Sequence, residues 1–214
     1  MTDDLVTALM PFAAVADLPL GEAALVYAQA GMPVVPCWAG SKIPATEHGF
    51  LDATTDIDQV AAWWAAHPRA NIGLATGIVA DVLDIDAHAT GTGFPAVQRL
   101  HQMGLIGGWS HAVRSPSGGL HLYYPCDPKR PNQTWSRGRA HIDVRGCGGY
   151  IVTVPSRSAC AAGGAGMRRS APPTRVSRWP GTGSASCSPP SRRPGRRRSC
   201  GRIFPSGCPG CRTG

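Results

Sequence analysis

The stretch VLDIDAH, residues 82–88, decides how the rest of the chain is interpreted. Val82, Leu83 and Ile85 are typical of a buried β-strand, yet Asp84 and Asp86 lie among them. Successive side chains of a strand point to opposite faces of its sheet. Asp84 and Asp86 therefore share one face, and Leu83 and Ile85 share the other, which we expect to face the core. Two carboxylates on one side of a central strand call for a chemical reason.

A third carboxylate lies in HIDVRG, residues 141–146, where Asp143 has apolar neighbours on both sides. If this strand lies beside the first, Asp84, Asp86 and Asp143 converge on one patch. Like charges that close raise one another's pKa, and a divalent cation removes the repulsion. Ligand sets made only of oxygen favour Mg²⁺ or Mn²⁺ over zinc. The sequence thus predicts a catalytic metal site suited to phosphoryl transfer. The alternative is the solvated outer face of an edge strand.

A glycine turn in SPSGGLH, residues 115–121, is the second candidate element. Ser117, Gly118 and Gly119 form the turn, and the glycines allow backbone amides to approach a ligand closely. His121 lies two residues into the next strand, where it can contact a phosphate group. We expect a nucleotide-binding segment here. An ordinary glycine turn beside a half-buried histidine is the alternative.

Basic residues are scarce before residue 158, so each one is informative. Arg114 precedes the glycine turn, and Arg145 follows Asp143 by two residues on the same strand face. Either could neutralise a triphosphate. Lys42, in the GSKIP segment, could contact phosphate or a template strand. Each of the three could equally be a surface cation.

Hydrophobic periodicity and turn residues predict an α+β fold, with mixed sheets covered by helices on one face. Thr55 or Asp56 can cap the second helix. We expect the last four strands to form two pairs, the first of them a hairpin through the glycine turn. The expected helices are 20–31, 57–68 and 93–104, and the expected strands are 32–38, 71–77, 80–86, 110–116, 120–125, 141–146 and 149–155.

The charge divides the chain into two unlike parts. Residues 1–157 carry all 13 acidic residues but only 10 of the 21 basic ones, a net charge of −3, although the whole chain carries +8. Residues 158–214 hold 11 arginines, no acidic residue and no leucine. Such a stretch cannot bury enough apolar surface to offset its ordering entropy. We expect an N-terminal extension over 1–19, a catalytic domain over 20–157, and a disordered basic tail over 158–214.

Three interpretations of this tail compete. It could be a basic arm that binds nucleic acid. It could be a zinc module, because Cys208 and Cys211 have the spacing of a zinc knuckle and Cys187 and Cys200 lie upstream. The third interpretation, which we favour, is translation of GC-rich DNA out of frame. Reading the gene in its other two frames past codon 157 distinguishes them.

The N-terminal and hydropathy patterns bear on location. There is no run of about 18 apolar residues, so we expect no transmembrane helix. The chain starts MTDDLVTALMPF, which is acidic where a secretory signal is basic. We therefore expect a cytoplasmic protein.

Five segments in order resemble the N-terminal domain of bifunctional DNA primase/polymerases, in the archaeo-eukaryotic primase superfamily. The resemblance runs from about residue 21 to residue 156, and the chain leaves the pattern after VPS. The order and spacing of the segments make it specific. They are AALVYAQAGMPVVPCWAGSKIP, GFLDATTDIDQVAAWWAAHPRANIGLATG, VLDIDAH, SPSGGLHLYY and HIDVRGCGGYIVTVPS.

The resemblance implies an N-terminal α/β module packed on a sheet like that of RNA-recognition motifs. It implies template-directed nucleotidyl transfer from NTPs or dNTPs, with single-stranded DNA as template. His121 matches the family histidine that contacts the triphosphate, and Arg145 and Lys42 match further family positions. The carboxylates that match the family's metal ligands are Asp84, Asp86 and Asp143.

Many members carry a helicase domain, so a helicase on another chain is an expected partner. A plasmid or prophage is the expected origin. Two alternatives stay open at this point. One is an inactive truncated remnant that retains at most metal–nucleotide binding. The other is a metal-dependent phosphohydrolase that uses the same carboxylates.

Overall fold

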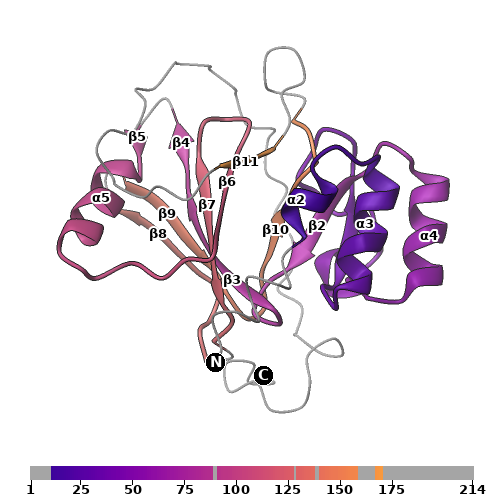
Figure 1. The fold of residues 1–214 in the computed structure, drawn as a ribbon, viewed down its shortest axis with the longest axis horizontal. Coiled ribbons are helices and arrows are strands. Elements are labelled where there is room, and N and C mark those ends of the chain that lie inside the picture. Colours follow the sequence, from indigo (N-terminus) through magenta and orange to yellow (C-terminus); the bar gives the residue numbers. More distant parts are fainter. Residues whose placement is uncertain (1–10, 89–90, 128, 138–139, 159–166, 171–214) are drawn as a thin grey trace.

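Two main β-sheets, with helices packed against them, make up the part of the chain that the computed structural model describes (Figure 1). That part comprises residues 11–88, 91–127, 129–137, 140–158 and 167–170. The α+β class is confirmed. The expectation of mixed sheets is wrong, because every strand pair in both sheets is antiparallel. Strand direction follows from how the strands are connected, which the apolar pattern of a single strand does not encode.

The smaller sheet has the strand order β1-β2-β10, formed by Val34–Cys37, Asn71–Ala75 and Tyr150–Val152. Helices α3 (Leu20–Gln29) and α4 (Ile57–Ala66) pack on each other and against this sheet (Figure 1). Both helices lie within the predicted ranges. Their apolar side chains recur at helical spacing, which gives each helix one face to bury.

Helix α4 shows how local sequence sets these bounds. The Asp56 side chain caps it and accepts hydrogen bonds from the backbone N–H groups of Asp58 and Gln59, at 3.0 and 3.2 Å. Of the two predicted capping residues, Asp56 is therefore the one used. At the other end, the buried Trp64 indole donates to the Ala70 carbonyl at 3.0 Å. The loop between β1 and α4 contains a short 3-10 helix, η1 (Gly49–Asp52).

The larger sheet has the order β11-β6-β7-β3-β9-β8. Strand β3 contains residues 82–85 of the VLDIDAH stretch and lies between β7 and β9, so the edge-strand alternative is excluded. The predicted hairpin of β6 and β7 is confirmed. In sheet order, the strands are Arg168–Ser170, His111–Arg114, Leu120–Pro125, Ala80–Ile85, Ala140–Arg145 and Gln133–Arg137.

Both faces of β3 are covered. Leu83 and Ile85 pack with helix α5 (Phe94–Gln102), so the predicted core face is confirmed. On the opposite face, Val82 joins a second cluster, which also includes Phe12 of helix α2 (Phe12–Val15). That cluster contains residues of both sheets and of α3 and α4, so one apolar core joins the two sheets. The two aspartates on this face therefore lie beside packed side chains.

The predicted pair of strands 141–146 and 149–155 is wrong. Strand β9 belongs to the larger sheet and β10 to the smaller one, so the chain crosses between sheets where a strand pair was expected. Glycines allow the crossing to pass close to other backbone. A Cβ on Gly146 would lie 2.3 Å from the Arg130 carbonyl oxygen, and one on Gly77 would lie 2.3 Å from the Cys147 Cα. Partner choice here depends on contacts distant in sequence.

Three findings concern the segments around the predicted catalytic domain. Helix α2 lies within the predicted N-terminal extension, and its Phe12 is fully buried. Strand β11 falls inside the predicted tail and pairs with β6, and Met167 beside it is buried, so residues 167–170 depart from the expected disorder. The rest of the tail lies outside the described residues, as do the cysteines considered for a zinc module.

Two further elements complete the description. A short pair, β4 (Ala87–His88) and β5 (Gly91–Thr92), follows β3 directly. In the described part of the chain, no helix has both the length and the apolar character needed to cross a membrane.

Candidate active site

Three carboxylates converge at one end of β3. Asp84 pairs directly with Asp143 on β9, and directly opposite residues of paired strands share a face. Asp86 follows the last residue of β3. Ligand oxygens from Asp84, Asp86 and Asp143 all lie within 4.8 Å of one another. The structure thus brings together the three aspartates that the sequence singled out.

The electrostatics of this cluster favour a bound cation. Asp84 is only 3% exposed, and burial raises its pKa, with the nearby Asp143 carboxylate acting in the same direction. The positive charges of Lys42 and Arg145 act in the opposite direction. The donor set is all oxygen and carries several negative charges in little space, which suits a hard divalent ion such as Mg²⁺ or Mn²⁺. The residues present therefore fit the metal that the sequence predicts.

Arg145 provides the closest positive charge. Its Nη2 donates a hydrogen bond to the Asp143 carboxylate and lies 3.8 Å from Asp84 Oδ2. Its buried Nε has no hydrogen-bond partner among the described residues. The guanidinium thus partly neutralises the carboxylates while keeping one donor unused. The predicted placement of Arg145 on the same face as Asp143 agrees with this geometry.

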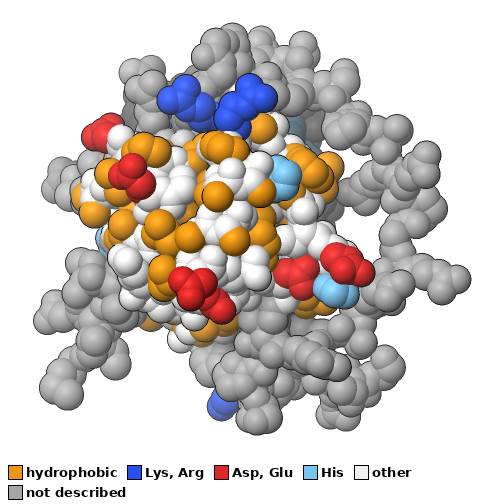
Figure 2. Space-filling view, turned by 90° about the vertical axis from the view of Figure 1, so that its right-hand side faces the viewer, with side chains coloured by type: hydrophobic (Ala, Val, Ile, Leu, Met, Phe, Trp, Pro, Cys, Tyr) orange, Lys and Arg blue, Asp and Glu red, His pale blue; other side chains and the backbone are white. Residues whose placement is uncertain are grey.

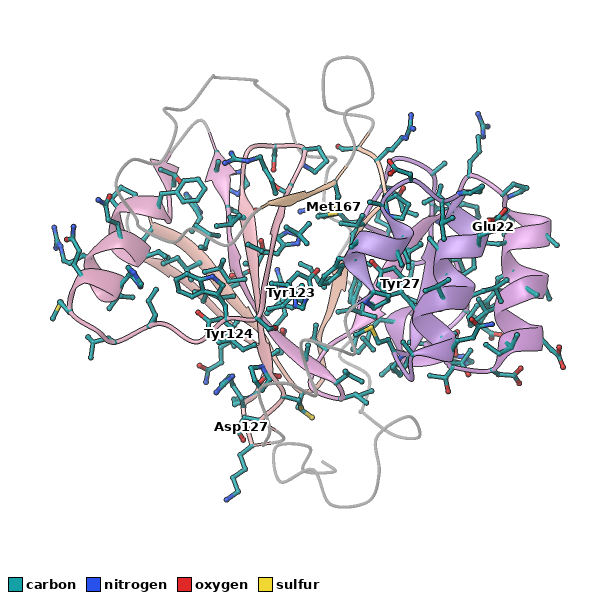
Figure 3. All side chains as sticks on the ribbon, viewed as in Figure 1. Glu22, Tyr27, Tyr123, Tyr124, Asp127 and Met167 are labelled. Atoms are coloured by element: carbon teal, nitrogen blue, oxygen red, sulfur yellow. The ribbon has the colours of Figure 1, made fainter. Side chains whose placement is uncertain are left out.

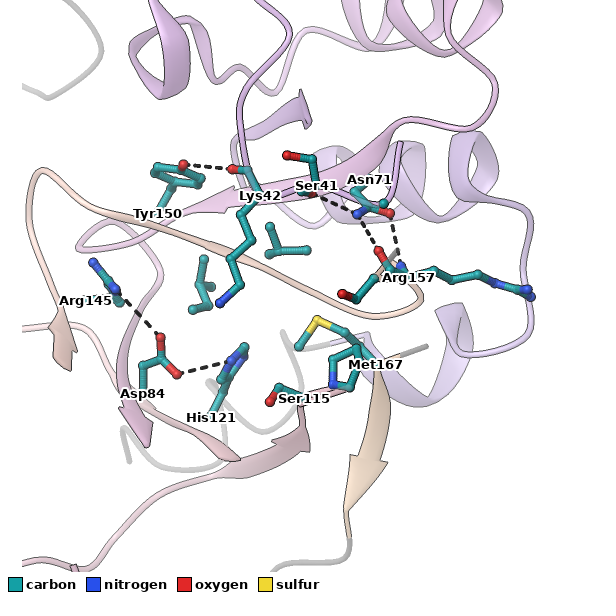
Figure 4. A pocket seen from close by; sticks show the side chains of 15 residues that line it. Ser41, Lys42, Asn71, Asp84, Ser115, His121, Arg145, Tyr150, Arg157 and Met167 are labelled. Atoms are coloured by element: carbon teal, nitrogen blue, oxygen red, sulfur yellow. Dashed lines mark hydrogen bonds and ion pairs between the residues drawn. The ribbon is translucent and has the colours of Figure 1, made fainter. Parts of the chain in front are cut away.

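His121 lies on the other side of Asp84. It pairs with Asp84 across β3 and β7, and its Nε2 is 3.3 Å from Asp84 Oδ1 (Figure 4). The ring is almost fully buried rather than half-buried. Burial, followed by the charge of Lys42, lowers the pKa of His121 to about 3, so the imidazole is neutral at physiological pH. Its Nδ1 is buried without a hydrogen-bond partner in the described structure.

Lys42 reaches the same place from the smaller sheet. It lies in the loop after β1, and its side chain extends toward Asp84 and His121 (Figure 4). The pocket around it therefore lies between the two sheets, with Asp84 and Arg145 of the larger sheet opposite Lys42, whereas Asp86 and Asp143 are not among its lining residues. Its lining residues are Gly40, Ser41, Lys42, Asn71, Asp84, Ser115, Pro116, His121, Arg145, Tyr150, Ile151, Val152, Arg157, Ser158 and Met167.

Asn71 fixes this loop, and the sequence analysis missed it. Its Nδ2 donates to the carbonyl oxygens of Ser41 at 2.9 Å and Arg157 at 2.6 Å, and its Oδ1 accepts from the Arg157 backbone N–H at 3.0 Å. The Asn71 side chain is only 2% exposed. The Lys42 carbonyl is held as well, by the Tyr150 hydroxyl at 2.8 Å. The sequence did contain a signal for this role, because Asn71 is a polar residue at the start of the otherwise apolar strand β2.

The glycine turn and Arg114 contribute less directly than expected. Ser115 and Pro116 line the pocket, whereas Ser117, Gly118, Gly119 and Arg114 are not among its lining residues. The Gly118 N–H donates to the Ser115 carbonyl at 3.0 Å and is thus used within the turn. A Cβ on Gly119 would lie 2.6 Å from the Ile85 carbonyl oxygen. This glycine therefore lets the turn pack on the end of β3.

Some charged side chains on the same strands lie away from the pocket (Figure 3). Asp127, labelled there, lies near the far end of β7, away from the pocket, where its backbone N–H donates to Asp81. The cations nearest the carboxylate cluster are Lys42 and Arg145. Lys42 and Arg145 thus provide positive charge beside the carboxylate cluster.

The family model for the bifunctional DNA primase/polymerase N-terminal domain matches residues 24–180. The chain belongs to this family. The match begins in α3 and continues beyond β11, so it extends further than the segments recognised in the sequence. A search of curated proteins found no match. Membership makes the chain one of a family of primase/polymerase-type enzymes, which are nucleotidyltransferases that typically depend on divalent metal ions.

Proposed function

We propose that this chain carries the catalytic domain of a DNA primase/polymerase. It would transfer nucleotidyl groups from NTPs or dNTPs to a 3′-hydroxyl, directed by a single-stranded DNA template. The observation that carries the proposal is the convergence of Asp84, Asp86 and Asp143 beside a buried histidine and a lysine. Family membership supports the same reaction class.

Asp84, Asp86 and Asp143 would hold Mg²⁺ or Mn²⁺. In this reaction class, one or two such ions stabilise the attacking and leaving oxygens of an in-line displacement. Asp84 and Asp143 sit on paired central strands, and this gives them fixed positions. Asp86 lies just beyond β3, where it is partly exposed and open to substrate from the solvent side.

The other pocket residues would bind the triphosphate. His121 is neutral and buried, so it offers one N–H donor to a phosphate oxygen without adding charge. Lys42 would neutralise phosphate charge from the opposite wall, and the unused Nε of Arg145 gives a further donor. Ser117, Gly118, Gly119 and Arg114 do not line the pocket, but they flank its lining residues Ser115 and Pro116 in the chain and stay weaker candidates for nucleotide contact. Pyrophosphate would leave as the new phosphodiester bond forms.

The antiparallel sheet with α5 on one face supports a relation to RNA-recognition motifs, which we include in the proposal. A helicase on a separate chain would supply the single-stranded template. The chemistry proposed for the pocket requires neither the relation to RNA-recognition motifs nor the helicase.

Template-dependent incorporation of a labelled nucleotide tests this function. We expect incorporation by the full chain with Mn²⁺ or Mg²⁺, and its loss in Asp143→Ala, whose carboxylate comes from a different strand than Asp84 and Asp86. Asp58→Ala is the matched control, because Asp58 is an exposed aspartate of α4. Pyrophosphate should appear only when template is present.

Other outcomes of these experiments would indicate one of the two alternative functions. Release of inorganic phosphate without template would indicate a phosphohydrolase. Absence of metal-dependent nucleotide binding by calorimetry would indicate an inactive remnant. Either result contradicts the proposed polymerase.

A further inference from the structure

Large apolar side chains are exposed at few places on the described chain, and two of these lie beside the pocket. Trp38 is 51% exposed and Ile43 is 58% exposed, and a backbone hydrogen bond of 2.9 Å joins them, from the Trp38 N–H to the Ile43 carbonyl. Lys42, which points into the pocket, directly precedes Ile43. The same short loop thus presents a cation inward and two apolar side chains outward. We call these two side chains the Trp38–Ile43 surface.

The indole of Trp38 is held in place although it is exposed. Trp38 follows β1 directly, and the last residue of that strand, Cys37, pairs with Asn71. Its ring meets the His67 ring edge-to-face with centroids 5.6 Å apart. A ring that is already positioned loses little conformational freedom when a ligand stacks on it.

Positive charge lies around this surface. Arg157 is exposed, its backbone is tied to Asn71, and its side chain extends away from the carboxylates (Figure 4). Arg69 is exposed two residues beyond His67. Figure 2 shows Lys and Arg side chains together at the upper edge of the face that α4 presents, with Asp and Glu side chains at its upper left and on its lower part. Charge complementarity at this edge favours a negatively charged ligand, and a strand with a phosphate backbone is one.

We propose that the Trp38–Ile43 surface binds the template strand by stacking on one of its bases, next to the nucleotide pocket. This inference rests on the proposed function and names how the template is held. Residues 1–157 carry a net charge of −3, so phosphate contacts alone give weak template affinity. Stacking on an aromatic ring adds affinity without added charge and tolerates any base. The adjacent cations complement the strand's phosphates.

The test compares two labelled single strands of equal length at one salt concentration, an oligothymidylate and its fully abasic analogue. The abasic strand keeps the phosphates and lacks the bases. We expect Trp38→Ala in the full chain to weaken oligothymidylate binding about tenfold and to leave abasic binding unchanged. Trp38→Phe keeps an aromatic ring and should retain most of the affinity. Leu105→Ala, which removes a side chain 64% exposed elsewhere, is the control for loss of apolar surface.

Mn²⁺–dATP binding, measured by calorimetry on the same proteins, separates this inference from the proposed function. If wild type binds Mn²⁺–dATP and Trp38→Ala binds both strands as wild type does, the stacking inference fails and the function stands. If wild type does not bind Mn²⁺–dATP, the proposed function fails. Equal weakening of binding to both strands by Trp38→Ala also overturns the inference. A change in oligomeric state in this variant overturns it as well, because it assigns the surface to a contact with a second copy of the chain.

Discussion

The two ends of β3 carry buried aspartates with opposite surroundings. Asp81 is 1% exposed and has its own partners, since its Oδ2 accepts from Arg130 Nη1 at 2.8 Å and from the Asp127 backbone N–H at 2.9 Å. Asp84 is 3% exposed, and its neighbours include Asp143 and Asp86. Its closest positive group, Arg145, is 3.8 Å away. Burial raises the pKa of both carboxyls.

We interpret this difference as one between a structural carboxylate and a carboxylate with a proposed function. The charge of Asp81 is paired with Arg130 within the fold, although its buried Oδ1 has no hydrogen-bond partner among the described residues. The charge of Asp84 is shared with two other carboxylates and balanced only in part. Residues that bind substrate or metal are commonly destabilising in the free protein, because their best partner is absent from the chain itself. Burial alone would not have distinguished the two.

The sharpest test is Asp84→Ala. We expect nucleotidyl transfer to fall at least about a thousandfold, because a ligand of the catalytic metal is lost. Thermal stability should stay the same or rise, since the substitution removes charge from a repulsive cluster. Incorporation assays and thermal unfolding measured together check this. A large loss of stability would place Asp84 in the structural class with Asp81.

Asn71→Ala extends the comparison to a buried amide whose partners are all within the fold. We expect a loss of about 2 kcal/mol in the free energy of unfolding, because three hydrogen bonds of a buried side chain disappear. Denaturant unfolding measures it. The KM for nucleotide should rise more than kcat falls, because the Lys42 loop loses its anchor. Asn71→Asp keeps the acceptor for the Arg157 N–H but turns a carboxylate oxygen toward the carbonyls of Ser41 and Arg157 in a buried site. It should therefore lose at least as much stability as Asn71→Ala, and a negligible loss would argue against this hydrogen-bond account.

Asp81→Ala is the counterpart of Asp84→Ala on the same strand. It should lower the free energy of unfolding by about 1 kcal/mol, a modest value because Arg130 is partly exposed and stays solvated. Metal-dependent nucleotide binding should be unchanged. Chemical denaturation and calorimetry with Mn²⁺–dATP provide the measurements. Weaker nucleotide binding would show that the two ends of β3 are not independent.

Arg145→Gln has the smallest expected effect. It tests directly whether the Arg145 guanidinium offsets part of the negative charge of the three carboxylates. Removing this cation should tighten the binding of Mn²⁺ alone about fivefold, because a repulsion of about 1 kcal/mol between guanidinium and metal is lost. The same variant should bind nucleotide more weakly. Isothermal calorimetry resolves both. If Mn²⁺ binds more weakly instead, Arg145 serves mainly to orient Asp143.

Local patterns predicted much of this molecule. The alternation around Asp84 identified β3, the face that packs on α5 and the side on which the carboxylates gather. The apolar spacing after Asp56 predicted α4, and the glycine turn predicted the hairpin of β6 and β7. Each of these signals is contained in a short stretch of chain. Convergence of the aspartates followed from the single assumption that two strands are neighbours.

Contacts between distant segments account for what was missed. The strands on either side of the glycines after Arg145 were expected to pair, but these glycines approach Arg130 and Gly77 closely where the chain passes into the other sheet. Strand β8 is largely polar and follows no alternation that the sequence displays. Asn71 acts through the backbone of Arg157, its hydrogen-bond partner across the pocket. Such roles exist only once the sheets are assembled.

The chain crosses between its two main sheets three times, after β2, after β9 and after β10, and this limits how the protein can be divided. The chain leaves the smaller sheet after β2 and returns to it as β10, and these two crossings are tied together where Thr76 donates to Gly146 at 2.8 Å and to Gly149 at 3.0 Å. A single cut in the polypeptide therefore cannot release either sheet as an intact piece. A split reporter or a circular permutant of this domain would have to keep these crossings, so new ends belong in an exposed turn away from the pocket, such as the one between α5 and β6.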